Sequence, residues 1–475
     1  MRFLREAVLP LLLALVLLVQ GLPALGSTFQ LRIIKGETRF EMVADMPRWV
    51  RREPLADGLR WTFTVRTPHQ YRIDKMLTRG PVRLVTLFHK GRTLLVDIHW
   101  RFPMPELVPT VTEHGIAFVI PRAVTRGSTI ELAQGLQYQR ISRWTDAGPL
   151  TMHFLRAHLG RVTVTPVPAY RSTFRGLDTL SRIVQRRGAL AGVNGSFFSP
   201  RAQAPIGLLF SHGEILSGSF FNRSVFGIRR DGTCFTSQAK MFVAIGDDSG
   251  KVWTAQAVNR PALKGGITLY TPHWGPRTGT RPDPSRREWS ISREGEVLKV
   301  TTGNSFIPRE GHVISVQGKG IYEMRNRLTQ GTSVVVYAKL AGRFAGAWHA
   351  IAAGPTLLEN GQVRVTAREE RLPADIARGR AARTAVGYMG GQEILLAAVD
   401  DRKGLSVGMT LYELARLMRE AGCKDAVNLD GGPSTTMAIR QRVMNNPRDG
   451  KERPIHNALL IYPHEAAPSD GDAIP

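Results

Sequence analysis

The chain has 475 residues and a formal net charge of +25, and 52 of its 64 basic residues are arginine. This length is typical of about two to four domains, and a hydrophobic content of 43% excludes a mainly disordered chain. Two cysteines, Cys234 and Cys423, are too few for a disulfide scaffold or a thiolate metal cluster, and buried free thiols are favoured over a bond between them. The arginine excess predicts an anionic partner, which could be nucleic acid, an anionic membrane surface or an acidic glycan.

The N-terminus has the pattern of a secretory signal. Arg2 and Arg5 precede an apolar run over residues 7–19, and small residues at 24–26 would allow cleavage before Ser27. We therefore predict a signal peptide over residues 1–26 and a secreted or periplasmic protein. An uncleaved anchor is the alternative, so contact with a membrane is expected only through this segment. Export argues against nucleic acid as the partner.

A strand-rich region follows the signal. Residues 28–132 alternate apolar and polar side chains with period two, for example at 29–33 and 59–65. This pattern predicts an all-β accessory domain, in which residues 88–94 form a hairpin turn.

The remainder predicts an α+β domain over residues 136–463, with a β-rich core and few helices. One helix is expected to begin near Asp178 and another after Thr410, which forms a capping box with Glu413. A hairpin-rich insertion is expected at about 250–345. Other hairpin turns are predicted at 211–214 and 230–233, and within the insertion at 292–296.

Two polar segments have no expected strand or helix. The Pro, Gly, Thr and Arg composition of residues 276–287 predicts a loop, either a plain basic surface or a lid. Residues 464–475 are polar and are expected to be disordered.

The segment 428–437 is the first candidate for chemistry, since the sequence has no HExxH, GxSxG or Walker lysine motif. In it an apolar strand ends at Asp430, and Gly431 and Gly432 would let a ligand approach the backbone N–H groups. The hydroxyls that follow suit phosphate oxygens; they belong to Ser434, Thr435 and Thr436. The alternative is a structural Asp-Gly-Gly turn.

Further polar residues stand at the ends of predicted strands. Arg383 and Thr384 begin one strand, and Asp400, Asp401 and Arg402 end the next. Two carboxylates near a basic fork could do acid–base work or hold a divalent cation, although a solvated turn is the commoner role of such a pair. Arg453 and Asn457 precede the final strand and add another cation and an amide.

Six motifs in order resemble those of the phosphodiester glycosidase family over roughly residues 136–463. They are residues 194–198 (NGSFF), 353–355 (AGP), 383–387 (RTAVG), 399–402 (VDDR), 428–437 (NLDGGPSTTM) and 453–459 (RPIHNAL). The chain departs from the family pattern at Ser196, Asp401 and Pro433, where Gly is usual, and at Thr435, where Ser is usual. Pro433 removes one backbone N–H from the loop that would face a phosphate.

The resemblance implies a cleft where the motifs converge and hydrolysis of a sugar-1-phosphodiester. It implies that Asp430 is an acid–base or nucleophilic carboxylate, with Asp400 as its partner. The residues implied to bind substrate are Asn194, Arg383, Thr384, Arg402, Gly431, Gly432, Ser434, Thr435, Thr436, Arg453 and Asn457. No cofactor is required by the sequence, metal ligands are not identified, and a divalent cation stays open.

The expected function is therefore that of an exported glycosidase acting on a sugar-1-phosphodiester in an envelope or extracellular glycan. Its products would be a free sugar and a phosphomonoester. One alternative is an envelope protein that binds anionic exopolysaccharide without catalysis, through the accessory domain and the cleft. Another is transfer of the sugar or phosphoryl group to an acceptor.

Overall fold

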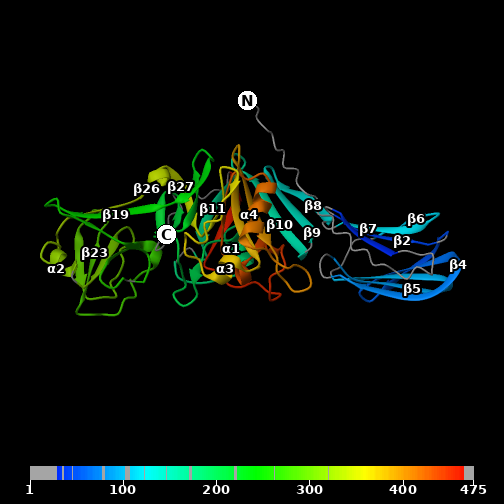
Figure 1. The fold of residues 1–475 in the computed structure, drawn as a ribbon. Coiled ribbons are helices and arrows are strands. Elements are labelled where there is room, and N and C mark those ends of the chain that lie inside the picture. Colours follow the sequence, from blue (N-terminus) through cyan, green and yellow to red (C-terminus); the bar gives the residue numbers. More distant parts are fainter. Residues whose placement is uncertain are drawn as a thin grey trace, which may run out of the picture. The chain divides into compact units, whose positions relative to one another are not determined.

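The structure is a computed structural model in which strands far outweigh helices, as the sequence predicted (Figure 1). It describes residues 29–34, 37–44, 46–77, 81–101, 107–121, 124–145, 147–170, 174–218, 222–261, 263–318 and 320–464. The signal peptide expected at 1–26 and the tail beyond His464 lie outside these residues. The chain divides into two units, residues 1–126 with 142–150, and residues 127–141 with 151–475.

The first unit contains two antiparallel sheets that share one hydrophobic core. One sheet, in the order β1-β2-β7-β6, consists of β1 (Phe29–Ile34), β2 (Glu37–Val43), β6 (Thr110–Thr112) and β7 (Gly115–Pro121). The other consists of β3 (Arg48–Leu55), β4 (Gly58–Met76) and β5 (Val82–Trp100). Trp61 of β4 and Phe118 of β7 meet edge to face, with ring centroids 4.9 Å apart.

The hairpin turn predicted at residues 88–94 is wrong. These residues lie inside β5, and Gly91 pairs with His69 of β4. The register shifts between Thr64 and His69, so Gly91, with φ of +62°, lies beside an irregularity of a long two-stranded ribbon. A glycine flanked by polar residues is typical of a turn and of a bulge alike, which explains the error.

The second unit is built around two sheets that pack on a common hydrophobic core, although residues 124–126 and 142–150 of the larger sheet are assigned to the first unit. The larger has the order β29-β28-β32-β30-β31-β10-β9-β8, with β8 (Val124–Ala133), β9 (Leu136–Thr145), β10 (Gly148–His158), β28 (Thr356–Glu359), β29 (Gln362–Val363), β30 (Arg383–Gly390), β31 (Glu393–Val399) and β32 (Asp425–Asn428). The smaller has the order β11-β35-β12-β33-β34, with β11 (Val162–Pro168), β12 (Ala191–Asn194), β33 (Met437–Ile439), β34 (Arg442–Val443) and β35 (Asn457–Pro463).

Two amphipathic helices pack on these sheets, and both were predicted. Helix α1 (Leu180–Arg186) buries Leu180, Ile183 and Val184 and contacts strands of the smaller sheet. Helix α4 (Leu411–Glu420) contacts β28, β29 and β32 of the larger sheet. The remaining helical segments are α2 (Gly320–Met324), α3 (Ala374–Arg378), η1 (Pro272–Trp274), η2 (Gly342–Phe344) and η3 (Gly432–Ser434).

Three further sheets and a short strand pair form the rest of the second unit, and they include the hairpin turns predicted at 211–214, 230–233 and 292–296. One sheet, in the order β16-β15-β27-β17-β18, contains β15 (Leu209–Ser211), β16 (Glu214–Ser217), β17 (Ser224–Arg229), β18 (Cys234–Gln238) and β27 (Ala347–Ala352). A second, in the order β20-β19-β26, contains β19 (Lys240–Asp247), β20 (Val252–Thr254) and β26 (Val334–Ala341). A third, in the order β21-β22-β25-β23-β24, contains β21 (Ala257–Val258), β22 (Ile267–Tyr270), β23 (Arg286–Ile291), β24 (Val297–Thr301) and β25 (His312–Gln317). β13 (Phe198–Ser199) pairs with β14 (Ala204–Pro205).

Two further observations bear on the sequence predictions. Cys234 and Cys423 are both free and buried, as predicted. Among the described residues, no helix combines the length and the apolar character needed to cross a membrane.

The capping box at the start of α4 gives a first prediction. The Thr410 hydroxyl accepts a hydrogen bond from the backbone N–H of Glu413, and the Glu413 carboxylate accepts one from the Thr410 N–H. We expect Thr410→Ala to lower the free energy of unfolding by about 0.5–2 kcal/mol. Urea denaturation followed by circular dichroism measures this loss. Thr410→Ser keeps the hydroxyl and should stay near wild type; an equal loss in both variants would contradict the capping role.

Candidate active site

The central feature of the candidate site is a loop, residues 429–436, which connects strands of the two sheets of the second unit. The loop leaves β32 of the larger sheet and enters β33 of the smaller one. Its backbone is held from both sides: Leu429 donates to the carbonyl oxygen of Thr384 (2.8 Å), and Asp430 donates to that of Gly195 (3.0 Å). Since Thr384 lies in β30 and Gly195 follows β12, motifs far apart in the sequence meet here.

Asn194 holds this loop through both polar atoms of its side-chain amide. Its Oδ1 accepts hydrogen bonds from the Thr384 hydroxyl (2.7 Å) and the Thr436 backbone N–H (3.0 Å). Its Nδ2 donates to the carbonyl oxygen of Asp430 (2.6 Å). Asn194 and Thr384 are both buried, so these two predicted binding residues brace the loop.

Asn457 performs a similar task at the start of β35. Its Oδ1 accepts from the backbone N–H of Ser196 (2.7 Å) and from the Ser196 hydroxyl (3.2 Å). A Cβ atom on Gly195 would lie 2.0 Å from this same oxygen, so only glycine fits between Asn194 and Ser196. The preceding residue, His456, donates a hydrogen bond from Nε2 to the carbonyl oxygen of Phe174 (2.6 Å), and burial lowers its pKa to about 4.

Asp430 is the carboxylate of the loop. Burial raises its pKa to about 6, because the charged form loses hydration. The Ser434 hydroxyl, the Gly431 backbone N–H, at 3.0 Å from Oδ1, and the charge of Arg453 act in the opposite direction and favour the carboxylate. A carboxyl group that titrates near pH 6 can exchange a proton at moderate pH, which suits acid–base chemistry.

The rest of the loop surrounds Asp430 with small polar groups. Gly432, with φ of +59°, begins the short helix η3, which ends at Ser434. The Thr436 hydroxyl donates to the carbonyl oxygen of Ser434 (3.3 Å). The Thr435 hydroxyl is buried and makes no hydrogen bond to any described residue, so it is a polar group that a ligand could satisfy.

Of the three predicted arginines, Arg383 and Arg453 differ in their environments. Arg383 is buried, and it donates to the carbonyl oxygens of Met409 (2.9 Å), Ile376 (3.0 Å) and Gly379 (2.6 Å). Burial lowers its pKa to about 10, so it stays charged at neutral pH. Arg453 is exposed and lies over the Phe198 ring, with its guanidinium carbon 6.0 Å from the ring centroid. Only Arg453 is therefore both exposed and electrostatically coupled to Asp430.

Asp400 lies in a closed network of its own. It has no exposed surface, and Oδ1 accepts from Asn445 Nδ2 (3.2 Å) while Oδ2 accepts from Asn446 Nδ2 (2.9 Å). The backbone N–H of Asn446 and the ring of His153, with Nε2 at 3.4 Å, also face it. Asn445 Nδ2 in turn donates to the carbonyl oxygen of Thr435 (3.1 Å), so Asp400 reaches the loop through Asn445.

Asp401 has a partner outside the loop, and Arg402 is exposed. Asp401 forms an ion pair with Arg448, whose Nε lies 2.9 Å from Oδ2. Arg402 is exposed, and its Nη2 is 3.8 Å from the position of a Cβ atom on Gly450. No group of three or more His, Cys, Asp or Glu side chains in the described part of the chain could hold a metal ion.

One buried acid was missed by the sequence reasoning. The Glu370 carboxylate accepts from Ser224 Oγ (2.5 Å) and Thr366 Oγ1 (2.5 Å), and it fills the place of a side chain on Gly354. Gly354 in turn accepts from Asn428 Nδ2 (2.9 Å), which ties the 353–355 motif to the strand that enters the loop. Glu370 lies 15 residues after the 353–355 motif and 13 residues before the 383–387 motif, so no local pattern signals it.

Residues 287–462 match the model of the phosphodiester glycosidase family, which confirms the resemblance over that part of the chain. The uncharacterized SPβ prophage-derived protein YomE of Bacillus subtilis (strain 168) is 36% identical over 84 residues. Those residues are 18% of this chain and only 13% of YomE.

Three solved structures are similar. A hypothetical protein from Synechocystis has a TM-score of 0.64 at 20% identity, covering 92% of this chain and 80% of that one. A proposed exported protein from Burkholderia pseudomallei K96243 has a TM-score of 0.60 at 18% identity, covering 77% and 100%. These two share the fold. The zebrafish N-acetylglucosamine-1-phosphodiester α-N-acetylglucosaminidase catalytic domain, auto-inhibited by its pro-peptide, has a TM-score of 0.38 at 15% identity, covering 72% and 84%, which is too low to support an argument.

The raised pKa of Asp430 predicts a pH-dependent effect on stability. The folded-state pKa of about 6 lies above the unfolded value of about 3.9, so this carboxyl favours the folded state when protonated, and that contribution is lost as the pH rises through 6. Asparagine cannot ionise. We therefore expect Asp430→Asn to have a free energy of unfolding on the order of 2–3 kcal/mol above wild type at pH 8, and a similar one near pH 4.

Urea denaturation at the two pH values measures this difference. Asp449→Asn removes an exposed acid of the same unit and should show no such dependence. A stability difference that is the same at pH 4 and pH 8 would contradict the raised pKa.

Proposed function

We propose, from the family match of residues 287–462, that this protein is a phosphodiester glycosidase that hydrolyses a sugar-1-phosphodiester to a free sugar and a phosphomonoester. The observation that carries the proposal is the environment of Asp430: a carboxyl with a pKa of about 6, set among hydroxyl and backbone N–H groups and coupled to the exposed Arg453. The signal pattern at residues 1–26 supports action on an envelope or extracellular glycan.

In the proposed reaction Asp430 acts as the carboxylate. It takes a proton from a water molecule whose oxygen forms a bond to the anomeric carbon of the sugar. The bond between that carbon and the phosphate oxygen breaks, and its electron pair stays on the phosphate. The exposed guanidinium of Arg453 would stabilise the negative charge that remains on the phosphate.

The leaving group explains how one carboxylate can suffice. In common glycosides the leaving oxygen needs a proton from a second carboxylic acid. A phosphomonoester is itself a stable anion at neutral pH, with a second pKa of about 6, and it can leave without that proton. This agrees with the closed environment of Asp400, which we propose to be a positioning residue that holds the loop through Asn445.

We further propose how the other predicted residues contribute. Asn194, Thr384, Arg383 and Asn457 keep the loop in place through the hydrogen bonds described above. Gly431, Gly432, Ser434, Thr435 and Arg453 are left to contact the phosphodiester. Binding of a divalent cation at this site is also a proposal, and measuring turnover with and without a chelator would test it.

The central test is turnover of a panel of sugar-1-phosphate methyl esters, with release of reducing sugar as the readout. Asp430→Asn should lower kcat/KM by about 10²–10⁴-fold, the usual contribution of acid–base catalysis. Asp449→Asn is the matched control and should retain activity. Full activity of Asp430→Asn would exclude our assignment, and binding of glycan without any product from wild type would favour the non-catalytic alternative.

The pH dependence tests the role of the carboxylate separately. Because the ionised form accepts the proton, kcat/KM should rise with pH through about 6 and then reach a plateau. Initial rates between pH 4 and pH 9 give this profile. An activity that falls as the pH rises through 6 would instead make Asp430 the acid.

Asp400→Asn distinguishes a positioning residue from a catalytic partner. The asparagine would turn an NH2 group toward amide donors of Asn445 and Asn446, so we expect a loss of at least about 2 kcal/mol of stability. The residual activity should keep the apparent pKa of about 6. If kcat/KM of this variant no longer rose with pH through about 6, or if turnover fell while stability was unchanged, Asp400 would be a catalytic partner after all.

A further inference from the structure

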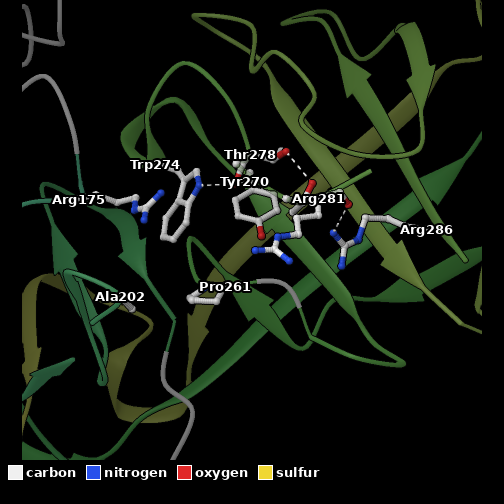
Figure 2. Close-up of a pocket in the computed structure, with 10 residues that line it drawn as sticks. Arg175, Ala202, Pro261, Tyr270, Trp274, Thr278, Arg281 and Arg286 are labelled. Atoms are coloured by element: carbon white, nitrogen blue, oxygen red, sulfur yellow. Dashed lines mark hydrogen bonds between the residues drawn. The ribbon is translucent and has the colours of Figure 1, made fainter. Parts of the chain in front are cut away.

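A second candidate site is a cavity of about 320 Å³ within the second unit (Figure 2), and none of its lining residues belongs to the loop at residues 429–436, called the motif loop below. Its walls come from two parts of the chain, one around residues 175–202 and the other at residues 261–286. The lining residues are Arg175, Ala202, Pro261, Tyr270, Trp274, Thr278, Gly279, Thr280, Arg281 and Arg286. These described residues include three arginines and no acid.

A buried carboxylate behind the wall, that of Glu288, is already occupied by hydrogen-bond donors. Glu288 is fully buried, and its oxygens accept hydrogen bonds from the hydroxyls of Thr278 (2.9 Å) and Thr280 (2.8 Å). The backbone N–H of Ser305 and the hydroxyl of Ser315 complete its partners, at 3.0 Å and 2.9 Å. This carboxylate therefore fixes the two lining threonines and has little capacity left to pair with an arginine of the cavity.

Arg286 is held rigidly at the wall. It is buried, and it donates from Nη1 to the carbonyl oxygen of Arg281 (3.1 Å) and from Nη2 to Gln317 Oε1 (2.9 Å). Its buried Nε–H has no hydrogen-bond partner among the described residues. The hydrogen-bond acceptors of this guanidinium are neutral, so it can donate its remaining N–H to an anion, but it shares its charge with Asp283, an acid that does not line the cavity.

Tyr270 supplies a second unpaired buried donor. Its side chain is completely buried, and its hydroxyl makes no hydrogen bond within the described part of the chain. Burial raises the pKa of Tyr270 well above its usual range, so the hydroxyl stays protonated and able to donate. In Figure 2 this hydroxyl and the guanidinium of Arg281 point to the same side of the cavity, toward Pro261.

Arg175 lies beside Trp274, at the other end of the cavity from Arg286 (Figure 2). Its guanidinium carbon lies 5.8 Å from the centroid of the Trp274 ring, and the ring is fixed by a hydrogen bond from Nε1 to the carbonyl oxygen of Thr278 (3.0 Å). Arg175 follows Phe174, whose carbonyl oxygen is bonded to His456 next to Asn457. The cavity is thus joined by a short stretch of chain to the residues that brace the motif loop.

We propose that this cavity binds an anionic sugar, one that carries a phosphate monoester or a carboxylate. Three guanidinium groups and two unpaired buried donors suit an oxyanion. The volume corresponds to roughly ten water molecules, which is more than a lone oxyanion needs, and it lies at the small end of the range for ligand pockets. One part of this inference, that the sugar belongs to the glycan cleaved at Asp430, rests on the proposed function. The existence of the anion site does not rest on it.

Isothermal titration calorimetry with four probes tests the proposal: glucose 6-phosphate, glucuronic acid, glucose and inorganic phosphate. We expect one or both anionic sugars to bind at least about tenfold more tightly than glucose and than inorganic phosphate. Arg281→Ala and Tyr270→Phe should each weaken this binding, the first by about tenfold or more. Arg309→Ala removes an exposed arginine of the same insertion that does not line the cavity, and it should bind like wild type.

The outcomes separate this proposal from the proposed function. Equal affinity for glucose and both anionic sugars would overturn the site, and inorganic phosphate binding as tightly as glucose 6-phosphate would overturn recognition of the sugar. Binding that survives in Arg281→Ala and Tyr270→Phe would place the site elsewhere and overturn the proposal too. Asp430→Asn should bind the anionic sugar like wild type. If the anionic sugar binds but no diester is turned over, only the proposed function is contradicted. If a diester is turned over but the anionic sugar does not bind, only this inference is contradicted.

Discussion

The side chain of Asn194 is the constraint on which the candidate site depends. It joins a hydroxyl of the larger sheet, a backbone N–H near the smaller sheet and the carbonyl oxygen of Asp430 through one buried amide. Each of these groups would otherwise be a buried polar group without a partner, which is costly. The loop between β32 and β33 can therefore cross between two sheets, carry an ionisable residue and still have a single conformation.

The position of Asp430 in this loop destabilises its ionised carboxylate. Burial opposes its charged form, and the nearby donors offset only part of this effect, so its pKa remains raised. A site that was optimal for stability would place an asparagine here. Retention of the acid is understandable if its proton is used, since functional sites are where proteins tolerate unfavourable groups.

Local patterns predicted the elements that local forces determine. The capping box of α4, the apolar stripe of α1 and three hairpin turns are set by residues within a few positions of one another. The turn predicted at 88–94 failed because a glycine near polar residues fits a turn or a bulge, and only the pairing of β4 with β5 decides between them. The convergence of the motifs was expected from a family resemblance, since spacing alone does not bring residue 194 to residue 430.

The roles of single side chains were harder to predict than their proximity. The family resemblance implies that Asp400 is the partner of Asp430. The residues that donate to Asp400, Asn445 and Asn446, lie 45 and 46 residues away and belong to no motif, so no local pattern predicts them. The roles of the individual arginines were equally hard to predict from the sequence. Among so many arginines, Arg383 binds backbone carbonyls, Arg453 acts on Asp430, and the arginines of the cavity come together only because distant segments pack side by side. In the two proposals made above, Arg453 and the cavity act differently. At Arg453 the charge to be stabilised would develop during bond cleavage, whereas the cavity would hold a permanent charge, so the first would affect rate and the second affinity.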